Sequence, residues 1–242
     1  MKNIVGIVQA RTGSTRLPNK VIKKIGKKTV LETLLCRIEK VDLINRLIVA
    51  TTTKKEDDII EIISLKNGFN VFRGSEENVL DRYYKTAKEY NAEIIVRITA
   101  DNPLTDSDLM QDIVNYLLNN NCDYVSSKEV ILGTGSEVFT FEALEDAWLN
   151  SKEKFQKEHV TPYIRENDKK FKVAYVNPVE VLKREDIRLT IDTPEDLKLY
   201  SELYNYLGDL SLVSINTIIN FMDSNPEIKR INQHVKQRYY KQ

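Results

Sequence analysis

Apolar positions along the first 130 residues fall into two alternating patterns. Short apolar runs are typical of buried strands, whereas apolar residues spaced three and four apart are typical of helices. The first helical pattern begins after Thr29, which forms a capping box with Glu32 three residues later. Thr105 and Asp108 have the same spacing and predict a second cap before a helix over residues 109–119.

The strand-like runs alternate with these helical patterns. They lie at residues 3–9, 46–50, 70–72, 93–99 and 123–126. Gly68 is expected to end a helix over residues 59–67, because glycine is common just past a helix end. Alternation of this kind builds a mostly parallel sheet with helices on both faces, so we expect an α/β, Rossmann-like fold.

The regular alternation of strand-like runs and helical patterns ends at Gly133. Segments 133–180 are expected to leave the sheet as a small excursion, with strands at 137–141 and 172–177 and helices at 142–150 and 156–167. Residues 187–191 are expected to return as a strand, followed by helices at 194–207 and 214–223. We expect one domain over residues 1–242, whose basic last dozen residues, with Tyr239 and Tyr240, fray or pack on a partner.

Composition narrows the class of protein. A hydrophobic share of 41% and a charged share of 30% are ordinary for a soluble domain. No apolar run reaches the ~18 residues of a membrane helix, and the first eight residues are typical of a strand rather than a signal peptide. The balance of 36 basic and 36 acidic residues argues against a broad nucleic-acid surface. The two cysteines, Cys36 and Cys122, do not have the spacing of metal ligands. A reducing cytoplasm is the simplest setting for so few cysteines.

The strongest chemical signal is the loop after the first strand, residues 10–20. In such sheets ligands bind beyond the carboxyl ends of the strands. The loop carries Arg11, Arg16 and Lys20, with Gly13 and Ser14 leaving backbone N–H groups open to an anion. Three cations with free amides suit a triphosphate, although a solvated basic loop has the same composition. Neither a P-loop nor a dinucleotide fingerprint is present.

Two aspartates follow strand-like runs. Asp101 comes directly after residues 94–98, and Asp192 comes after residues 189–191. Two carboxylates at strand ends can hold Mg²⁺ together with phosphate oxygens, although Asp192 before Thr193 and Pro194 also suits a helix cap. Asp106 and Asp108 formally match the D-x-D motif of metal-dependent glycosyltransferases. They lie in the first turn of an expected helix, however, where acidic residues stabilise the helix terminus, so we assign them a structural role.

The chain resembles the CMP-sugar synthetases, the acylneuraminate and deoxyoctulosonate cytidylyltransferases, and most closely their spore coat polysaccharide biosynthesis protein F-like relatives. The resemblance covers nearly the whole chain. It is carried by QARTGSTRLPNK at 9–20, IVATTT at 48–53, VFRGS at 71–75, VLDRY at 79–83, RITADNP at 97–103, EVF at 137–139, EHVTPY at 158–163 and LTIDTPEDL at 189–197. It implies a nucleotidyltransferase, glycosyltransferase-A-like sheet and transfer of CMP from CTP to a sugar or sugar-acid acceptor.

The resemblance also implies roles for individual residues. Asp101 and Asp192 are expected to bind Mg²⁺, and Lys20, Arg11 and Asp101 to be catalytic. The nucleotide is expected to contact Ala10, Arg11, Gly13, Ser14, Arg16, Lys20, Arg73 and Thr99. The acceptor is expected to contact Gly135, Glu137 and His159.

A homodimer is also implied, paired through apolar residues of the excursion: Val138, Phe139, Phe141 and Trp148. The alternatives that stay open are another nucleotide, a non-sugar acceptor, a glycosyltransferase that uses a finished nucleotide sugar, and a nucleotide-sugar sensor without turnover.

Overall fold

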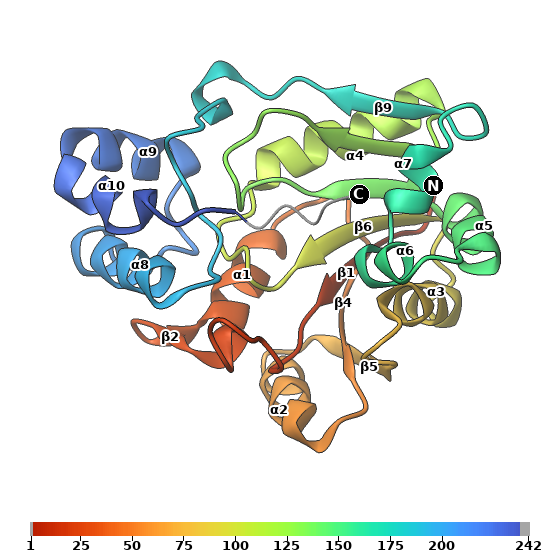
Figure 1. Ribbon diagram of the computed structural model, residues 1–242, viewed down its shortest axis with the longest axis horizontal. Helices are drawn as coiled ribbons and strands as arrows, with labels where there is room; N and C mark the ends of the chain where they lie inside the picture. The colour runs from red at the N-terminus through yellow and green to blue at the C-terminus, as the bar shows by residue number, and fades with distance from the viewer. Residues whose placement is uncertain (1, 238–242) are drawn as a thin grey trace.

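A seven-stranded sheet forms the centre of the protein in the computed structural model, which describes residues 2–237 (Figure 1). Its strands are β1 (Ile4–Gln9), β4 (Arg46–Thr52), β5 (Asn70–Gly74), β6 (Ile94–Thr99), β7 (Tyr124–Ser127), β8 (Glu137–Thr140) and β9 (Val173–Val176). The spatial order is β5-β4-β1-β6-β8-β7-β9, and only β8 runs antiparallel to its neighbours. The expected α/β fold with a mostly parallel sheet is confirmed.

Ten helices and a short hairpin complete the described part of the chain. The helices are α1 (Val30–Ile38), α2 (Asp58–Lys66), α3 (Val79–Glu89), α4 (Ser107–Asn120), α5 (Phe141–Asn150), α6 (Lys154–His159), α7 (Pro162–Glu166), α8 (Pro194–Leu207), α9 (Ile215–Ser224) and α10 (Pro226–Gln233). The hairpin pairs β2 (Lys24–Ile25) with β3 (Lys28–Thr29), and single 3₁₀ turns lie at η1 (Lys20–Ile22), η2 (Lys55–Asp57) and η3 (Glu180–Leu182). The sequence analysis did not anticipate α10.

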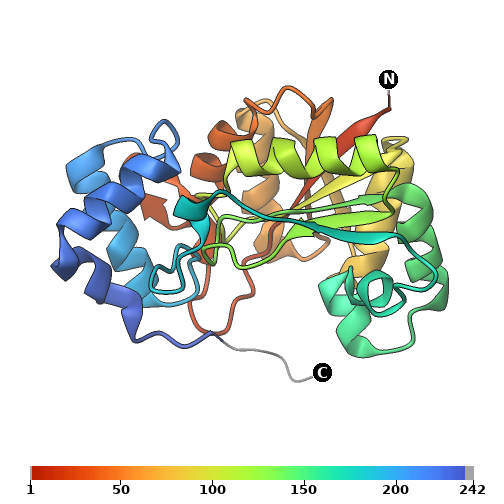
Figure 2. The same cartoon turned by 90° about the horizontal axis from the view of Figure 1, so that it is seen from above.

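Alternating side chains of the strands divide the core into two layers. In β1, Ile4 and Val8 pack with α1 and α4 on one face, while Val5 and Ile7 pack with α3 and α5 on the other. The groups α8–α10 and α5–α7 lie at opposite ends of the sheet (Figure 2). Both faces of the central strands are therefore buried, which explains why these strands are continuous apolar runs.

Local signals at the helix ends are confirmed in two places and corrected in two. Thr29 and Glu32 form the expected capping box, and Gly68 has a φ of 84° just past α2. The predicted cap at Thr105 is wrong, because the Asp106 carboxylate accepts the hydrogen bond from Leu109 N and caps α4. The expected helix over 156–167 is two helices, separated at Val160, whose φ is 72°.

The segment 133–180 differs from expectation because its two strands lie in the main sheet. β8 inserts between β6 and β7, and β9 forms the outer edge beside β7. The expected returning strand at 187–191 is wrong: this stretch makes only an isolated bridge from Arg188 to Leu132. Its Ile191 N–H donates to the Asp101 carbonyl oxygen at 2.8 Å, so it ties two loops together instead of extending the sheet.

The apolar residues expected at a dimer surface are used inside the chain. Val138 and Phe139 are fully buried in β8. The Trp148 ring stacks on Tyr84 at 4.1 Å between centroids, and its indole N–H donates to Asp81. Val138 and Phe139 therefore do not supply the expected interface, whereas Phe141 and Trp148 are half-buried and the homodimer stays a prediction. Tyr239 and Tyr240 lie outside the described residues. Within residues 2–237, no helix combines the length and apolar character of a membrane span.

Candidate active site

The basic loop after β1 is held in a fixed shape by η2, the 3₁₀ turn that follows β4. The carboxylate of Asp57, in η2, accepts hydrogen bonds from both Thr12 N and Thr12 Oγ1, each at 2.7 Å. The Thr12 carbonyl oxygen in turn accepts from Ser14 N and Asn19 N. Asn19 has a φ of 60°, a left-handed conformation that asparagine tolerates, and η1 begins at the next residue, Lys20. The loop is thus folded back on itself before its first helical turn.

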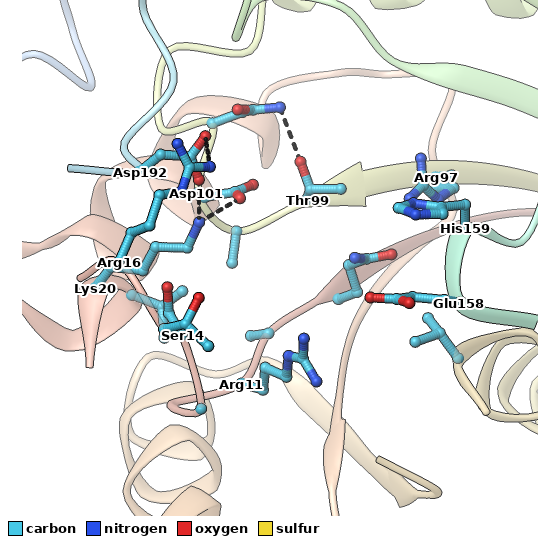
Figure 3. Close-up of a pocket in the computed structure, with 18 of the residues that line it drawn as sticks. Arg11, Ser14, Arg16, Lys20, Arg97, Thr99, Asp101, Glu158, His159 and Asp192 are labelled. Atoms are coloured by element: carbon cyan, nitrogen blue, oxygen red, sulfur yellow. Dashed lines mark hydrogen bonds and ion pairs between the residues drawn. The ribbon is translucent and has the colours of Figure 1, made fainter. Parts of the chain in front are cut away.

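This loop forms one wall of a cavity of about 490 Å³ at the carboxyl ends of the strands (Figure 3). The opposite wall comes from the end of β6, from α6 and from the segment before α8. Ten residues of the expected site line the cavity: Ala10, Arg11, Gly13, Ser14, Arg16, Lys20, Thr99, Asp101, His159 and Asp192. The structure therefore brings together residues that lie up to 182 positions apart in the chain.

Lys20 lies at the centre of the charged cluster. Its ammonium nitrogen is 2.6 Å from Asp101 Oδ2 and 2.8 Å from Asp192 Oδ1. The Lys20 side chain is 12% exposed, and that of Asp192 is 13% exposed. Burial would lower the pKa of Lys20, but the two carboxylates raise it above its ordinary value. The ammonium group is therefore charged at neutral pH.

Asp192 is surrounded by three cations. Its second oxygen, Oδ2, accepts from Arg16 at 2.9 Å and from Arg188 at 3.0 Å. Burial would raise the pKa of Asp192, but Lys20, Arg16 and Arg188 hold it below its ordinary value. The carboxylate is therefore ionised at neutral pH.

The sequence analysis missed the network that fixes Asp192. Arg188 Nε donates to the fully buried Asp196 at 2.9 Å, and Asp196 also accepts from the backbone N–H of Asp192. Arg188 Nη1 donates to Gln237, which lines the cavity from the C-terminal segment. The capping box of Thr193 and Asp196 begins α8, so Asp192 stands immediately before a fixed helix start. The available signal in the sequence was the position of Arg188 and Asp196, four residues before and four residues after Asp192.

The carboxylates of Asp101 and Asp192 fit a magnesium site in their donor chemistry. Each places one oxygen within 2.8 Å of the same cationic nitrogen, so the two groups converge on one position. Among residues 2–237 no group of three or more histidine, cysteine, aspartate or glutamate side chains could hold a metal. Two carboxylates are sufficient for Mg²⁺ when phosphate oxygens and waters complete its octahedral shell.

Arg73 lies away from this cavity. Its guanidinium pairs with Asp58 at 2.6 Å and with Glu61 at 2.8 Å, both on α2, and donates to the carbonyl oxygens of Thr52 and Lys54. It is not among the residues lining the 490 Å³ cavity. Arg73 thus joins α2 to the end of β5, and the structure does not group it with the other expected nucleotide contacts.

A second cavity of about 250 Å³ lies beside the first. Arg97, Thr99 and Asn102 line both cavities. Gly135 and Glu137, expected at the acceptor, line the second cavity, whereas His159 lines the first. Hydroxyl groups dominate the remaining wall, which includes Tyr124, Ser126, Ser127 and Ser136.

Glu137 is enclosed by donors. Its Oε1 accepts from Tyr124 Oη at 2.5 Å and from Thr161 Oγ1 at 2.7 Å, and its Oε2 pairs with Arg97. Arg97 and Glu137 are directly opposite each other in the β6–β8 register. Burial would raise the pKa of Glu137, but Arg97 keeps it below its ordinary value. Glu137 is therefore an ionised anchor for Arg97, a residue that the sequence analysis missed.

His159 shares the environment of Arg97 (Figure 3). Its ring packs on Phe155 with centroids 4.6 Å apart. Burial lowers the pKa of His159 from its ordinary value, and the nearby arginines oppose protonation too. The imidazole is therefore neutral at pH 7.

Comparison with known proteins identifies relatives over the full chain. The family model described as cytidylyltransferase matches residues 5–220. An uncharacterized protein of Methanocaldococcus jannaschii is 57% identical, covering 99% of this chain and 98% of its own. The spore coat polysaccharide biosynthesis protein SpsF of Bacillus subtilis is 36% identical, covering 94% of this chain and 97% of its own.

Solved structures show the same fold. A cytidylyltransferase from Leptospira borgpetersenii superposes with a TM-score of 0.89 at 32% identity, covering 99% of this chain and 100% of the other. The CMP:2-keto-3-deoxy-manno-octonic acid synthetase complexed with CTP superposes with a TM-score of 0.62 at 15% identity, covering 84% of this chain and 99% of the other. The second likeness concerns the fold alone.

Proposed function

The chain belongs to the cytidylyltransferase family, and we propose that it transfers CMP from CTP to a hydroxyl group of a sugar or sugar-acid acceptor. The observation that supports this most strongly is the convergence of Lys20 with Asp101 and Asp192 in a cavity walled by Arg11 and Arg16. Such a cavity offers cations to a triphosphate and carboxylates to its metal ion. The name of the Bacillus subtilis relative supports a place in surface polysaccharide synthesis.

In the proposed reaction an acceptor oxygen attacks the α-phosphorus of CTP. The bond from that phosphorus to the bridging oxygen breaks, pyrophosphate leaves, and the acceptor hydroxyl loses its proton to solvent. Arg11, Arg16 and Lys20 stabilise the negative charge that develops on the phosphates. The Gly13 backbone N–H group and the Ser14 side chain, with Ala10 and Thr99 beside them, complete the nucleotide contacts that we propose. The Ser14 N–H group, which the sequence led us to expect open to an anion, instead donates to the Thr12 carbonyl oxygen.

Asp101 and Asp192 are the proposed magnesium ligands. A bound Mg²⁺ supplies charge neutralisation at the phosphate oxygens. In the structure, the same carboxylates pair with Lys20 at 2.6 Å and 2.8 Å and keep it ionised. Positioning and electrostatics account for such a transfer without a protein nucleophile.

The acceptor is proposed to occupy the second cavity. Its volume of about 250 Å³ and its hydroxyl-rich wall suit a small polyhydroxylated molecule. Because Arg97, Thr99 and Asn102 line both cavities, an acceptor there would lie next to the nucleotide. Gly135 and His159 are retained as proposed contacts, while Glu137 would act through Arg97.

A cytoplasmic location is part of the proposal. Cys36 and Cys122 are both free thiols, which suits a reducing compartment.

Pyrophosphate release tests the function. Purified protein with Mg²⁺ is supplied with CTP, ATP, GTP or UTP and with a panel of sugars and sugar acids. We expect release only with CTP and only when a suitable acceptor is present. Lys20→Met should abolish release, whereas Lys28→Met, which removes a lysine paired with Asp209 away from the cavity, should not. Release of a nucleoside diphosphate from a nucleotide sugar would instead support a glycosyltransferase.

A further inference from the structure

The oxygens that would hold a metal ion already have a cation between them. Lys20 Nζ contacts Asp101 Oδ2 and Asp192 Oδ1 (Figure 3), while Asp192 Oδ2 is shared by Arg16 and Arg188. Both oxygens of Asp192 are thus in ion pairs.

A magnesium ion and the Lys20 ammonium group cannot share this position. Mg²⁺ binds oxygen at about 2.0–2.1 Å in octahedral geometry. An ammonium nitrogen 2.6 Å and 2.8 Å from the same two oxygens fills the space between them and repels a second cation. A metal ion can bind both of these oxygens only after Lys20 moves away.

Leaving the carboxylates is unfavourable for Lys20 by itself. Its side chain is 12% exposed, so outside the ion pairs it would be a poorly hydrated charge. An unpaired buried charge is strongly destabilising. Lys20 therefore needs another anion within reach, and the phosphates of a nucleotide in the same cavity would supply it.

We propose that Lys20 is the counter-ion of the Asp101–Asp192 pair in the nucleotide-free protein, and that it makes metal and triphosphate binding interdependent. A bound metal ion would take the place of the Lys20 ammonium group between the carboxylates, and Lys20 would then pair with the phosphates of the nucleotide. This proposal rests on the proposed role of the two aspartates as metal ligands. Since coupling between two ligands is reciprocal, each should bind more tightly when the other is present.

Metal binding without nucleotide provides the test, with Mn²⁺ as the calorimetric probe. Wild-type protein should bind Mn²⁺ weakly. Lys20→Met, which keeps most of the length of the side chain but removes its charge, should bind Mn²⁺ at least about tenfold more tightly, within the usual range of coupling between sites. Asp192→Asn in the Lys20→Met background should remove that gain.

Arg11→Met is the matched control. It removes a positive charge from the same loop, but the ion pair of Arg11 is with Glu76 at 3.9 Å and not with either aspartate. We expect Mn²⁺ affinity to change less than about threefold, well below a coupling of this kind. Equal gains in Arg11→Met and Lys20→Met would overturn the proposal, because they would reflect only the net charge of the cavity.

Wild-type protein gives an independent measurement. A lysine ammonium held in ion pairs gives observable ¹H–¹⁵N signals, and adding CTP with Mg²⁺ should shift the Lys20 signal while Mg²⁺ alone should not. A shift with Mg²⁺ alone, at low millimolar concentration, would contradict the proposal. The metal titrations contain neither nucleotide nor acceptor, so they test the counter-ion role separately from the proposed function. If Lys20→Met did not bind Mn²⁺ more tightly while the wild-type protein still released pyrophosphate from CTP, the counter-ion role would be rejected and the proposed function would stand.

Discussion

Replacing Glu137 with glutamine is expected to be one of the most destabilising single changes in this protein. The substitution keeps the shape of the side chain but removes its charge. Arg97 then stays in the sheet, at 15% exposure, without the carboxylate opposite it. The hydrogen bonds from Tyr124 and Thr161 would also lose their ionised acceptor.

The expected cost follows from the burial of the pair. Removing one partner of a fully buried ion pair leaves an uncompensated charge and typically costs about 3–5 kcal/mol, which is the upper limit for this pair at 15% and 17% exposure. Domains unfold with free energies of about 5–15 kcal/mol, so this loss is a large part of the total. Replacing both partners, as in Arg97→Met with Glu137→Leu, should cost less than Glu137→Gln because no buried charge is left unpaired.

Urea denaturation followed by circular dichroism measures these differences. Glu180→Gln is the matched control, since Glu180 is 87% exposed in its pair with Lys183. An exposed pair of this kind contributes about 0–1 kcal/mol. A loss for Glu137→Gln that is no larger than for Glu180→Gln would refute the reasoning, as would a double variant less stable than Glu137→Gln.

Three further outcomes are expected. Because the pKa of Glu137 is lowered in the folded protein, its stabilisation is present above the ordinary glutamate value of about 4.3 and is lost as pH falls through the lower folded value. Glu137→Gln should therefore flatten the acid limb of a stability–pH curve. In the pyrophosphate assay, Asp101→Asn and Asp192→Asn should each reduce the rate about 100-fold, whereas Asp106→Asn, at the N-cap of α4, should cost only ~0.3–1 kcal/mol of stability. Light scattering should give twice the chain mass of 28.1 kDa, as expected for a homodimer; a monomer that turns over would remove that expectation.

The parts of the fold that depend on neighbouring residues could be predicted from the sequence. The capping box of Thr29 and Glu32 involves residues three apart, and the apolar face of α1 repeats within two turns. The place of β8 could not be predicted in this way. Its four residues enter the sheet between β6 and β7, antiparallel to both, and nothing in the local alternation encodes which strands it will pair with.

The candidate site likewise contains residues that local sequence identifies and contacts that only the strand register explains. The loop around Lys20 and the aspartates Asp101 and Asp192 were identifiable, because each follows a recognisable strand-like run or lies in a family motif. The pairing of Arg97 with Glu137 joins residues 40 positions apart. It required the β6–β8 register, although opposite charges inside two apolar strands hinted at a partner.

The contrast between Arg73 and the loop of Lys20 shows what strand order adds to such reasoning. All these residues lie near carboxyl ends of parallel strands, where ligands are expected. The chain passes from β1 to β4 and then to β5 on one side, and crosses to the other side of β1 for β6. The point where the order reverses lies between β1 and β6, the strands that deliver Lys20 and Asp101. Arg73 is the penultimate residue of the edge strand β5, two strands from that point, where carboxylates of α2 bind it instead. Strand order therefore separates Arg73 from the residues that line the cavity, and apolar periodicity does not encode that order.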